Sequence, residues 1–354
     1  MAASSLFSFI FLLLIIPLFS TALTSMHGLN DHSSIQQVVS SNGHDDLLLM
    51  SAYNQFSAFK EKYNKTYLTQ EEDDYRFGVF MSNLHQARRN QILDPTAIHG
   101  VTKFSDLTPS EFRTQYLRFD GQIQLLKHLK TAPILPTNNL PTTFDWRDDG
   151  AVTGVKHQGQ CNACWAFASI ATLETAHFLA NDQLVDMSEQ QLLDCSDECT
   201  YDKRICNRGC QGGNHVLAYR YMLNVGGVEA TKDYPYTGID GSCKFDKNKI
   251  VASIYEFNDI IADEDQYAAN LVEYGTIAVE VNGDALQTYT GGILCPPCVD
   301  TYNHGVTLVG YGSDRHWIIK NSFGTNFGEN GYYRLCKGRL TCGKNPVAAF
   351  PLSA

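Results

Sequence analysis

The sequence predicts an α+β protein with a helical subdomain, a β-rich subdomain and a cleft between them. The first observation is a nearly unbroken apolar stretch from Cys164 to Ala180, which is typical of a helix buried on most faces. The second is a change to strand patterns separated by glycines near the C-terminus. These patterns lie at Thr276–Val281, Gly305–Gly310, Trp317–Lys320 and Tyr332–Leu335.

The chain begins with a segment typical of a secretory signal. Residues Leu6 to Phe19 are apolar and uncharged, and small residues follow at Thr21, Ala22 and Ser25. The alternative is a membrane anchor, but a span needs about 20 apolar residues. We therefore expect residues 1–25 to form a signal peptide that is removed. The mature protein is then expected in the secretory pathway, in a vacuole or lysosome or outside the cell.

Composition and charge narrow the function classes. Hydrophobic residues make up 44% of the chain and charged residues 18%, as in a globular protein. The net charge of −11 argues against nucleic acid or an anionic membrane as a partner. All 11 cysteines follow residue 160, which in an oxidising compartment predicts five disulfides and one free thiol. Asn64 opens an Asn-Lys-Thr sequence, a candidate glycosylation site in a secreted chain.

Two helices are predicted ahead of a linker. Apolar residues recur at helical spacing from Ala52 to Tyr63. A longer helix from about Gln70 to Leu93 opens with acidic residues and stops before Pro95. One face of it carries Glu72, Arg76, Phe80, Asn83, Ala87 and Gln91, a pattern that also fits an ordinary amphipathic helix. The weakly patterned stretch from Gln122 to Leu140 contains prolines, and it predicts a linker open to proteolysis.

Two short helices are predicted after the buried one. Ser188-Glu189-Gln190-Gln191 fits a capping box that opens the first. The second runs from Asn214 to about Asn224 and ends at Gly226-Gly227.

The strongest candidate for chemistry is Cys164. As the free thiol at a helix N-terminus, it would lie beside backbone N–H groups that favour the thiolate. A nucleophile needs a base and the base needs an orienting group. His304, which is 140 residues further on at the start of a strand, and Asn321, at the end of the next strand, suit these roles. The Gln158 amide, with the Cys164 backbone N–H, could stabilise an oxyanion.

Metal and redox sites are the rival interpretations, because two C-x-x-C sequences are present. They are Cys161–Cys164 and Cys295–Cys298. A zinc ribbon would place two such pairs about 15–20 residues apart, but 130 residues lie between Cys164 and Cys295. A thioredoxin-type site would need a short βαβ context, which neither sequence has. We therefore expect no metal and no cofactor.

With these four residues in place, the chain resembles the papain-like cysteine proteases, in particular their cathepsin-F-like branch. The resemblance covers nearly everything from about Ala52. Its motifs lie at Leu140–Trp146, Cys210–Gly213, Asn303–Gly305 and Ile319–Gly324. It implies a papain-like fold with a helical left domain and a β-barrel-like right domain. It also implies a cysteine endopeptidase that hydrolyses peptide bonds through Cys164, His304, Asn321 and Gln158.

The N-terminal pattern gains a meaning from the same resemblance. The helix face described above, together with Gly100, Phe104 and Asp106, is similar to the family's inhibitory prosegment. The implied organisation is a propeptide at 26–139 with an inhibitor domain at about 52–112, and a mature protease domain at 140–354. The protein would be made as a zymogen whose propeptide lies in the cleft and is removed on acidification. Asp106 is a hypothetical acid trigger.

The resemblance also implies binding residues and disulfides. The substrate-binding positions are Gly212, Gly213, Asn162, Ala278, Tyr302, Gly305, Phe323 and Val347. The mostly apolar group Ala278, Tyr302, Gly305 and Val347 implies a bulky apolar residue one place before the scissile residue. The implied disulfides are Cys161–Cys210, Cys195–Cys243, Cys298–Cys342, Cys199–Cys206 and Cys295–Cys336. Protein and peptide substrates, the chain's own propeptide and cystatin-like inhibitors are the implied partners of a monomer.

Several positions depart from the family pattern. Asn162-Ala163 replaces Gly-Ser between the two cysteines, and Asn303 replaces Asp before the histidine. Phe323 and Phe327 replace tryptophans, which keeps an apolar cover but removes an N–H donor. We expect reduced activity or altered specificity. The alternative is a protease-fold binding protein with weak or no catalysis.

Overall fold

A computed structural model describes residues 43–117, 129–299, 301–340 and 348–353. The expected signal peptide, the start of the expected propeptide and Val347 and Cys342 lie outside these ranges. Two compact units are distinguished, residues 1–52 and residues 53–354. The description of the first unit is confined to the beginning of helix α2 (Gly43–Tyr63). Everything below concerns the second unit.

The N-terminal segment, here residues 53–117, consists mainly of helices. The end of α2 and α3 (Gln70–Leu93) pack through the buried rings of Phe56, Phe59 and Phe80. Helix α3 begins after Thr69, whose hydroxyl accepts from the Glu72 backbone, and this confirms the predicted range. Strand β1 (Ala97–His99) and helix α4 (Pro109–Tyr116) follow.

Sequence reasoning missed α4 and placed the start of α2 too late. Thr108 and Glu111 form a complete capping box at the start of α4, and Pro109 occupies its first turn. This Thr-Pro-x-Glu pattern was available in the sequence. The extension of α2 back to Gly43 had no comparable signal, because the added turns lack the regular apolar spacing seen after Ala52.

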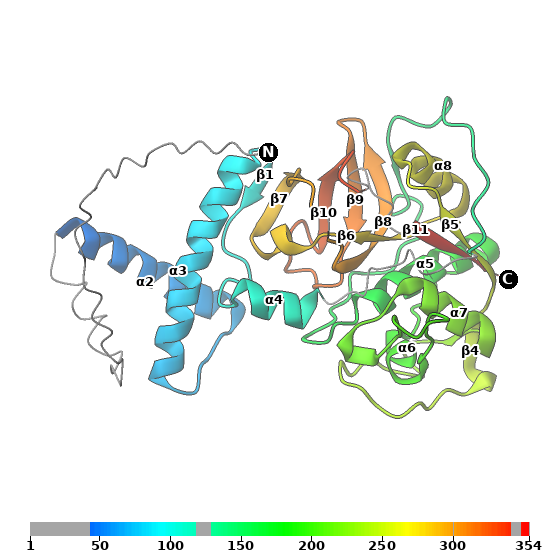
Figure 1. Cartoon of the computed structure of the whole chain (residues 1–354), viewed down its shortest axis with the longest axis horizontal. Helices are drawn as coiled ribbons and strands as arrows, with labels where there is room; N and C mark the ends of the chain where they lie inside the picture. Colours follow the sequence, from blue (N-terminus) through cyan, green and yellow to red (C-terminus); the bar gives the residue numbers. More distant parts are fainter. Residues whose placement is uncertain (1–42, 118–128, 300, 341–347, 354) are drawn as a thin grey trace, which may run out of the picture. The chain divides into compact units, whose positions relative to one another are not determined.

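The helical half of the C-terminal part holds three helices, which Figure 1 shows in green on one side of the sheet. The helix Cys164–Asn181, labelled α5, is almost completely buried, as its composition predicted. Its last residue is followed by Asp182 in the left-handed conformation. The helices are α5 (Cys164–Asn181), α6 (Glu189–Cys195) and α7 (His215–Val225). The predicted starts at Ser188 and Asn214 are confirmed, since both side chains cap their helices.

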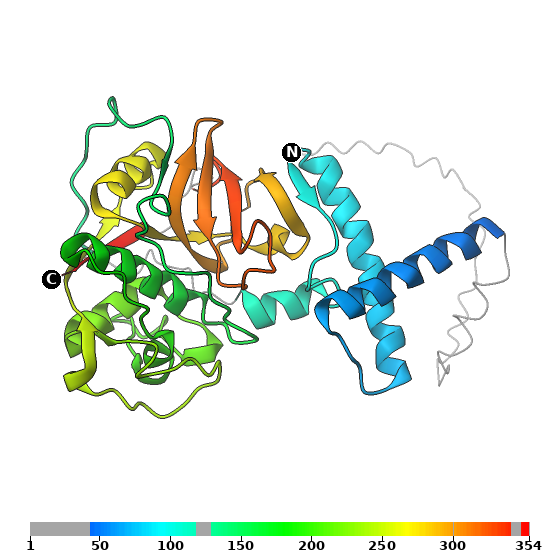
Figure 2. The same cartoon turned by 180° about the vertical axis from the view of Figure 1, so that it is seen from behind.

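The β half is one large sheet in the order β1-β7-β10-β9-β8-β6-β11-β5, with β2 also paired to β8. Neighbouring strands are antiparallel except β7 and β10. Figure 2 shows β8, β9 and β10 side by side, with α8 (Glu264–Tyr274) at the far end of the sheet. The strands are β2 (Phe144–Asp145), β5 (Ile254–Ile260), β6 (Ile277–Val281), β7 (Tyr289–Leu294), β8 (His304–Gly312), β9 (His316–Lys320), β10 (Tyr332–Cys336) and β11 (Ala348–Ser353).

The architecture is the α+β fold that the sequence predicts. A small second sheet pairs β3 (Val228–Glu229) with β4 (Ile250–Ala252). One core lies between the sheet and the N-terminal segment, and a second core joins α5, α6 and α7. Helix α5 contacts both β8 and β11. The N-terminus of α5 and the start of β8 therefore come together, which is where the candidate site lies.

Candidate active site

Cys164 is the first residue of α5 and is fully buried. It is the free cysteine of the described residues. Ala163 precedes it without a side-chain cap, so the helix offers its first N–H groups to other partners. Burial raises the pKa of the Cys164 thiol to about 12, although backbone N–H groups of Gly305, Trp165 and Cys164 itself act in the opposite direction. Gly305 is the second residue of β8, so the sulfur lies near the start of that strand.

His304 and Asn321 lie at adjacent strand ends. Strands β8 and β9 are antiparallel, so the start of β8 lies beside the end of β9, where Thr307 faces Lys320. The His304 Nε2 atom is 2.8 Å from Asn321 Oδ1, which also accepts from the Ser322 backbone at 2.8 Å. This second bond fixes the Asn321 amide, so its oxygen accepts from the imidazole. Within the described ranges, His304 Nδ1 has no hydrogen-bond partner.

Burial lowers the pKa of His304 to about 4, and the bond to Asn321 opposes this. The imidazole is therefore neutral, with its proton on Nε2 and its Nδ1 lone pair available. The Phe323 ring is stacked on the imidazole at 4.9 Å between ring centroids and is itself fully buried. Phe323 thus shields the hydrogen bond between His304 and Asn321 from water.

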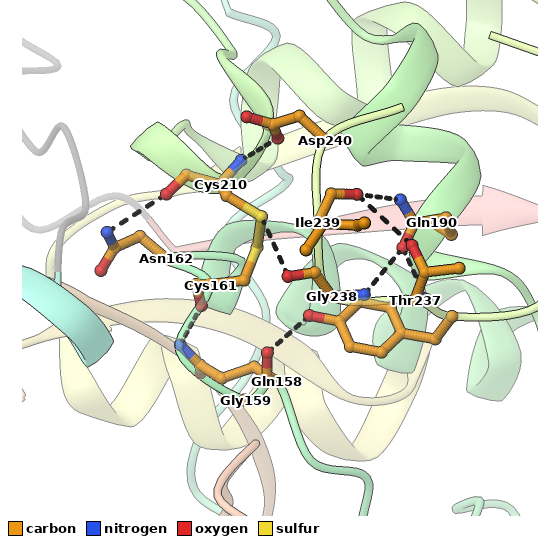
Figure 3. Close-up of a disulfide and its surroundings, with 12 residues drawn as sticks. Gln158, Gly159, Cys161, Asn162, Gln190, Cys210, Thr237, Gly238, Ile239 and Asp240 are labelled. Carbon is orange, nitrogen blue, oxygen red and sulfur yellow. Dashed lines mark hydrogen bonds between the residues drawn. A yellow bond between two sulfur atoms is a disulfide. The ribbon is translucent and has the colours of Figure 1, made fainter. Parts of the chain in front are cut away.

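Gln158 is held in place by bonds to both ends of its amide. Its Oε1 accepts from Ser322 Oγ at 2.6 Å, and its Nε2 donates to the Cys161 carbonyl at 2.9 Å. Figure 3 shows this second bond beside the Cys161–Cys210 disulfide. The remaining Nε2 hydrogen donates to the carbonyl of Tyr116 in the N-terminal segment, at 3.2 Å. A carbonyl oxygen therefore already lies where Gln158 could stabilise an oxyanion.

The other residues implied to bind substrate fall into two groups. Asn162, Gly212 and Gly213 lie around Cys210, and the position of a Cβ at Gly213 would be 2.7 Å from the Trp165 ring. Ala278 on β6 is fully buried in the core. Gly305 on β8 faces Glu280 across the strand pair, whereas Tyr302 lines a separate cavity of about 330 Å³ beneath α3 and α4. Val347 lies outside the described residues.

The cysteines are paired as follows. Disulfides join Cys161–Cys210, Cys195–Cys243, Cys199–Cys206 and Cys295–Cys336, the pairs that the resemblance implies. Cys298 is also disulfide-bonded, while Cys342 lies outside the described residues. No cluster of side chains in the described ranges could hold a metal ion.

The N-terminal segment covers the site with the end of α4. Tyr116 and Phe112 surround the Phe323 ring, at 5.7 and 6.1 Å between centroids, and Phe104 lies 5.2 Å from it. Asn162 Nδ2 donates to the Thr114 carbonyl at 2.8 Å. No pattern in the sequence indicated that two of the positions that depart from the family, Asn162 and Phe323, would contact this helix.

A lysine contact was also missed. Lys103 Nζ lies 2.9 Å from His157 Nε2 and 3.0 Å from Asn326 Oδ1, and it also contacts the Phe323 carbonyl. Burial lowers the pKa of Lys103 to about 8. Burial and the adjacent lysine lower the pKa of His157 to about 4. His157, to which sequence reasoning assigned no role, therefore stays neutral and binds the N-terminal segment.

Comparisons with known proteins identify the family of the chain. Residues 140–352 match the family model "Papain family cysteine protease", and residues 56–112 match "Cathepsin propeptide inhibitor domain (I29)". The chain is 51% identical to cysteine proteinase 15A of Pisum sativum, with 96% of both chains covered. It is 40% identical to cathepsin F of Mus musculus over 83% of this chain and 63% of that protein.

Solved structures give the same result for the fold. The recombinant stem bromelain precursor superimposes with a TM-score of 0.75 at 30% identity, covering 85% of this chain and 98% of that one. Procathepsin L2 from Tenebrio molitor superimposes with a TM-score of 0.75 at 29% identity, covering 85% of this chain and 99% of that one. The chain therefore belongs to the papain family of cysteine proteases and carries a cathepsin-type propeptide inhibitor domain.

Proposed function

We propose that Cys164 is the nucleophile of this protease and that His304, Asn321 and Gln158 complete its catalytic site. The 2.8 Å hydrogen bond between His304 Nε2 and Asn321 Oδ1 is the observation that carries this proposal, because it leaves Nδ1 as the ring nitrogen without a partner among the described residues. Asn321 fixes the ring so that Nδ1 faces the reaction.

The reaction follows from these positions. His304 Nδ1 takes the thiol proton while the Cys164 sulfur bonds to the carbonyl carbon of the scissile peptide. The carbonyl oxygen becomes an oxyanion and accepts from Gln158 Nε2 and the Cys164 N–H. The C–N bond then breaks, and the amine leaves with the proton from His304. Water attacks the thioester, His304 takes a proton from that water, and the carboxylic acid leaves as the thiol is restored.

The propeptide would keep this site inactive by occupying it. We propose that residues 26–139 form the propeptide, with the inhibitor domain at about 52–112, and that residues 140–354 form the mature enzyme. The matched ranges 56–112 and 140–352 support these limits. The Tyr116 carbonyl accepts from Gln158 Nε2, and both the thiol and the imidazole that exchange a proton are buried in the zymogen.

The test of this function is the reactivity of Cys164 before and after acid processing. With a thiol pKa of about 12, the thiolate fraction in the zymogen at pH 8 is about 10⁻⁴. Removing the propeptide exposes both groups, which lowers the pKa of the thiol and raises that of His304. We expect a thiol-reactive epoxide to label Cys164 at least about 100-fold faster in the processed chain than in the zymogen.

Labelling is followed by peptide mass spectrometry, with a zymogen carrying Cys164→Ser as the background control. An intact but unlabelled Cys164 in the processed chain, together with no hydrolysis of peptides, would instead support the binding-protein alternative.

Asp106 is proposed to be part of the acid response. Its buried carboxylate accepts from Lys65 Nζ at 2.9 Å and from the Tyr67 hydroxyl at 2.9 Å. Loss of the negative charge at this position takes away the partner of Lys65 and so loosens the N-terminal segment. Asp106→Asn imposes this loss at every pH, and we expect it to destabilise the segment by about 1–3 kcal/mol.

Self-processing of the Asp106→Asn zymogen is therefore expected at a higher pH than in the wild type, measured by gel analysis after incubation across a pH series. Asp73→Asn is the matched control, because Asp73 pairs with Lys60 in the same segment but has no bond to the loop before α4. An unchanged pH of processing in Asp106→Asn would rule out this role.

We propose that the protein enters the secretory pathway and acts in a vacuole or lysosome or outside the cell. The apolar N-terminal run and the disulfides support this route. No helix in the described ranges is long and apolar enough to cross a membrane. Protein substrates and the chain's own propeptide are its partners as a protease of this family. Cystatin-like inhibitors, a monomeric state and glycosylation at Asn64 remain proposals.

A further inference from the structure

Asn162 presents an amide donor to the occupant of the active site. Its Nδ2 atom donates to two carbonyl oxygens, that of Cys210 at 3.2 Å and that of Thr114 at 2.8 Å. Since both neighbours can only accept, the NH₂ group faces them. One of these partners belongs to the protease itself, and the other belongs to the propeptide.

The bond to Cys210 holds the donor in place independently of the propeptide. The Asn162 backbone N–H donates to the same Cys210 carbonyl at 3.2 Å. The neighbouring residue Cys161 is joined to Cys210 by a disulfide, and Figure 3 shows the Asn162 amide turned toward the Cys210 carbonyl beside that disulfide. When the propeptide leaves, the bond to the Cys210 carbonyl stays and the bond to the Thr114 carbonyl is lost. Because the Asn162 side chain is already fixed in this way, it loses little further conformational entropy when a ligand binds.

The position of this donor relative to the scissile bond follows from α4. Thr114 and Tyr116 belong to the last turn of the helix, where carbonyl groups have no partner within the helix. Tyr116 offers its carbonyl to Gln158, and Thr114 offers its carbonyl to Asn162. Carbonyl oxygens two residues apart in a helix are about 5 Å from each other. The Asn162 donor therefore serves an oxygen about 5 Å from the oxyanion position.

A substrate in extended conformation can supply that oxygen from one side chain. In an extended substrate, the nearest main-chain carbonyl on the same side as the scissile carbonyl is two residues along the chain. It lies about 7 Å from the scissile carbonyl, since each residue rises about 3.3 Å. The side chain of the residue that contributes the scissile carbonyl is long enough, if it is a glutamine, to bring a neutral carbonyl oxygen closer than that. A carboxylate is less suitable, because the Asp240 carboxylate accepts from the backbone N–H of Cys210 at 2.6 Å, and the carbonyl of the same residue accepts from Asn162.

We propose that Asn162 makes this protease prefer glutamine as the residue that contributes the scissile carbonyl. The proposal rests on the catalytic site proposed above and adds a specificity determinant to it. In the zymogen, Asn162 Nδ2 donates to the Thr114 carbonyl of the propeptide. In the mature enzyme, the glutamine Oε1 takes the place of that carbonyl as the acceptor.

The test compares two peptides that differ only at the residue before the scissile bond. One carries glutamine and the other methionine, which has nearly the same length but no oxygen, and both carry leucine at the preceding position. In the acid-processed enzyme we expect kcat/KM to be about five- to tenfold higher for glutamine, the value of one neutral hydrogen bond. A glutamate peptide is expected to be cleaved less well than the glutamine peptide.

Asn162→Gly removes the donor, and we expect the ratio of glutamine to methionine to fall to about one. Ala163→Ser is the matched control, because it alters the neighbouring residue and leaves the Asn162 amide intact, so its ratio should stay at the wild-type value. The ratio of two substrates measured on one sample does not depend on how much of that sample is folded.

A ratio near one in the wild type, an unchanged ratio in Asn162→Gly, or faster cleavage of the glutamate peptide overturns the role of Asn162 while leaving the protease function standing. If the wild type hydrolyses no peptide and Cys164 stays unlabelled, the proposed catalytic site and the inference both fail.

Discussion

A zymogen with Cys164→Ser is expected to remain uncut at acidic pH and to lose peptide hydrolysis by at least about 10⁴-fold. The serine hydroxyl is a far weaker acid than a thiol, so it needs a stronger base to become a nucleophile. His304 has no carboxylate partner, since its Nε2 is bonded to the neutral Asn321 amide. A neutral amide stabilises the imidazolium less than a carboxylate would, so this site cannot compensate for the poorer nucleophile.

The measurement is hydrolysis of a fluorogenic peptide together with gel analysis of the zymogen. Traces of processed wild-type enzyme added to the variant should cut it at the linker, which shows that the variant is folded and its cutting site accessible. Self-processing of the pure variant at a rate within about tenfold of the wild type would mean that another residue is the nucleophile.

The largest effect on stability is expected at Lys156, which is surrounded by acidic side chains next to the catalytic strands. Its Nζ lies 3.0 Å from Glu174, 2.7 Å from Glu189 and 2.6 Å from Asp186. The carboxylates of Glu174 and Glu189 are 1% and 2% exposed, so they depend on this lysine. Replacing Lys156 by Met leaves them buried beside each other, and we expect the free energy of unfolding to fall by about 3–5 kcal/mol.

The pH dependence of this loss provides a second check. Burial raises the pKa of Glu189, and Lys156 opposes that increase. Without Lys156, the folded-state pKa of Glu189 rises further above its unfolded value, so proton binding stabilises the folded chain and this stabilisation disappears as the pH rises. The difference between variant and wild type should therefore be largest at neutral pH and shrink as the pH falls toward the acidic range.

Urea unfolding of the processed enzyme blocked with the epoxide, at about pH 5 and about pH 7, measures both effects. Arg204→Met in the same processed enzyme is the control, because Arg204 is mostly exposed and pairs with Asp202 at the surface; we expect a change below about 1 kcal/mol. A Lys156→Met enzyme as stable as the wild type at neutral pH would show that the two glutamates find other partners.

The sequence predicted the parts of this molecule that depend on local pattern. The α5 composition, the caps at Ser188 and Asn214 and the strand ends carrying His304 and Asn321 are all short-range signals. The fold class followed from them. All five implied disulfide pairs came from family resemblance, since spacing alone allows many connectivities, and four of them are present in the described residues.

The parts that escaped prediction depend on residues far apart in the chain. Helix α4 had a local signal that was overlooked, but its contact with Gln158 joins residues 42 positions apart. The contact of Lys103 with His157 and the acidic group around Lys156 likewise have no periodic pattern. Such contacts arise only once the two halves of the fold have been brought together.

Strand β1 has a consequence for the life of the mature enzyme. It forms the outer edge of the sheet by pairing with β7, where Ala97 faces Gly292 and Ile98 faces Gly291. Removal of the propeptide also removes this strand, so the backbone groups of β7 become an unprotected sheet edge. The mature enzyme is thus active but carries an unprotected sheet edge. The zymogen should consequently aggregate less than the mature enzyme in crowded compartments. Aggregation during storage should increase after processing.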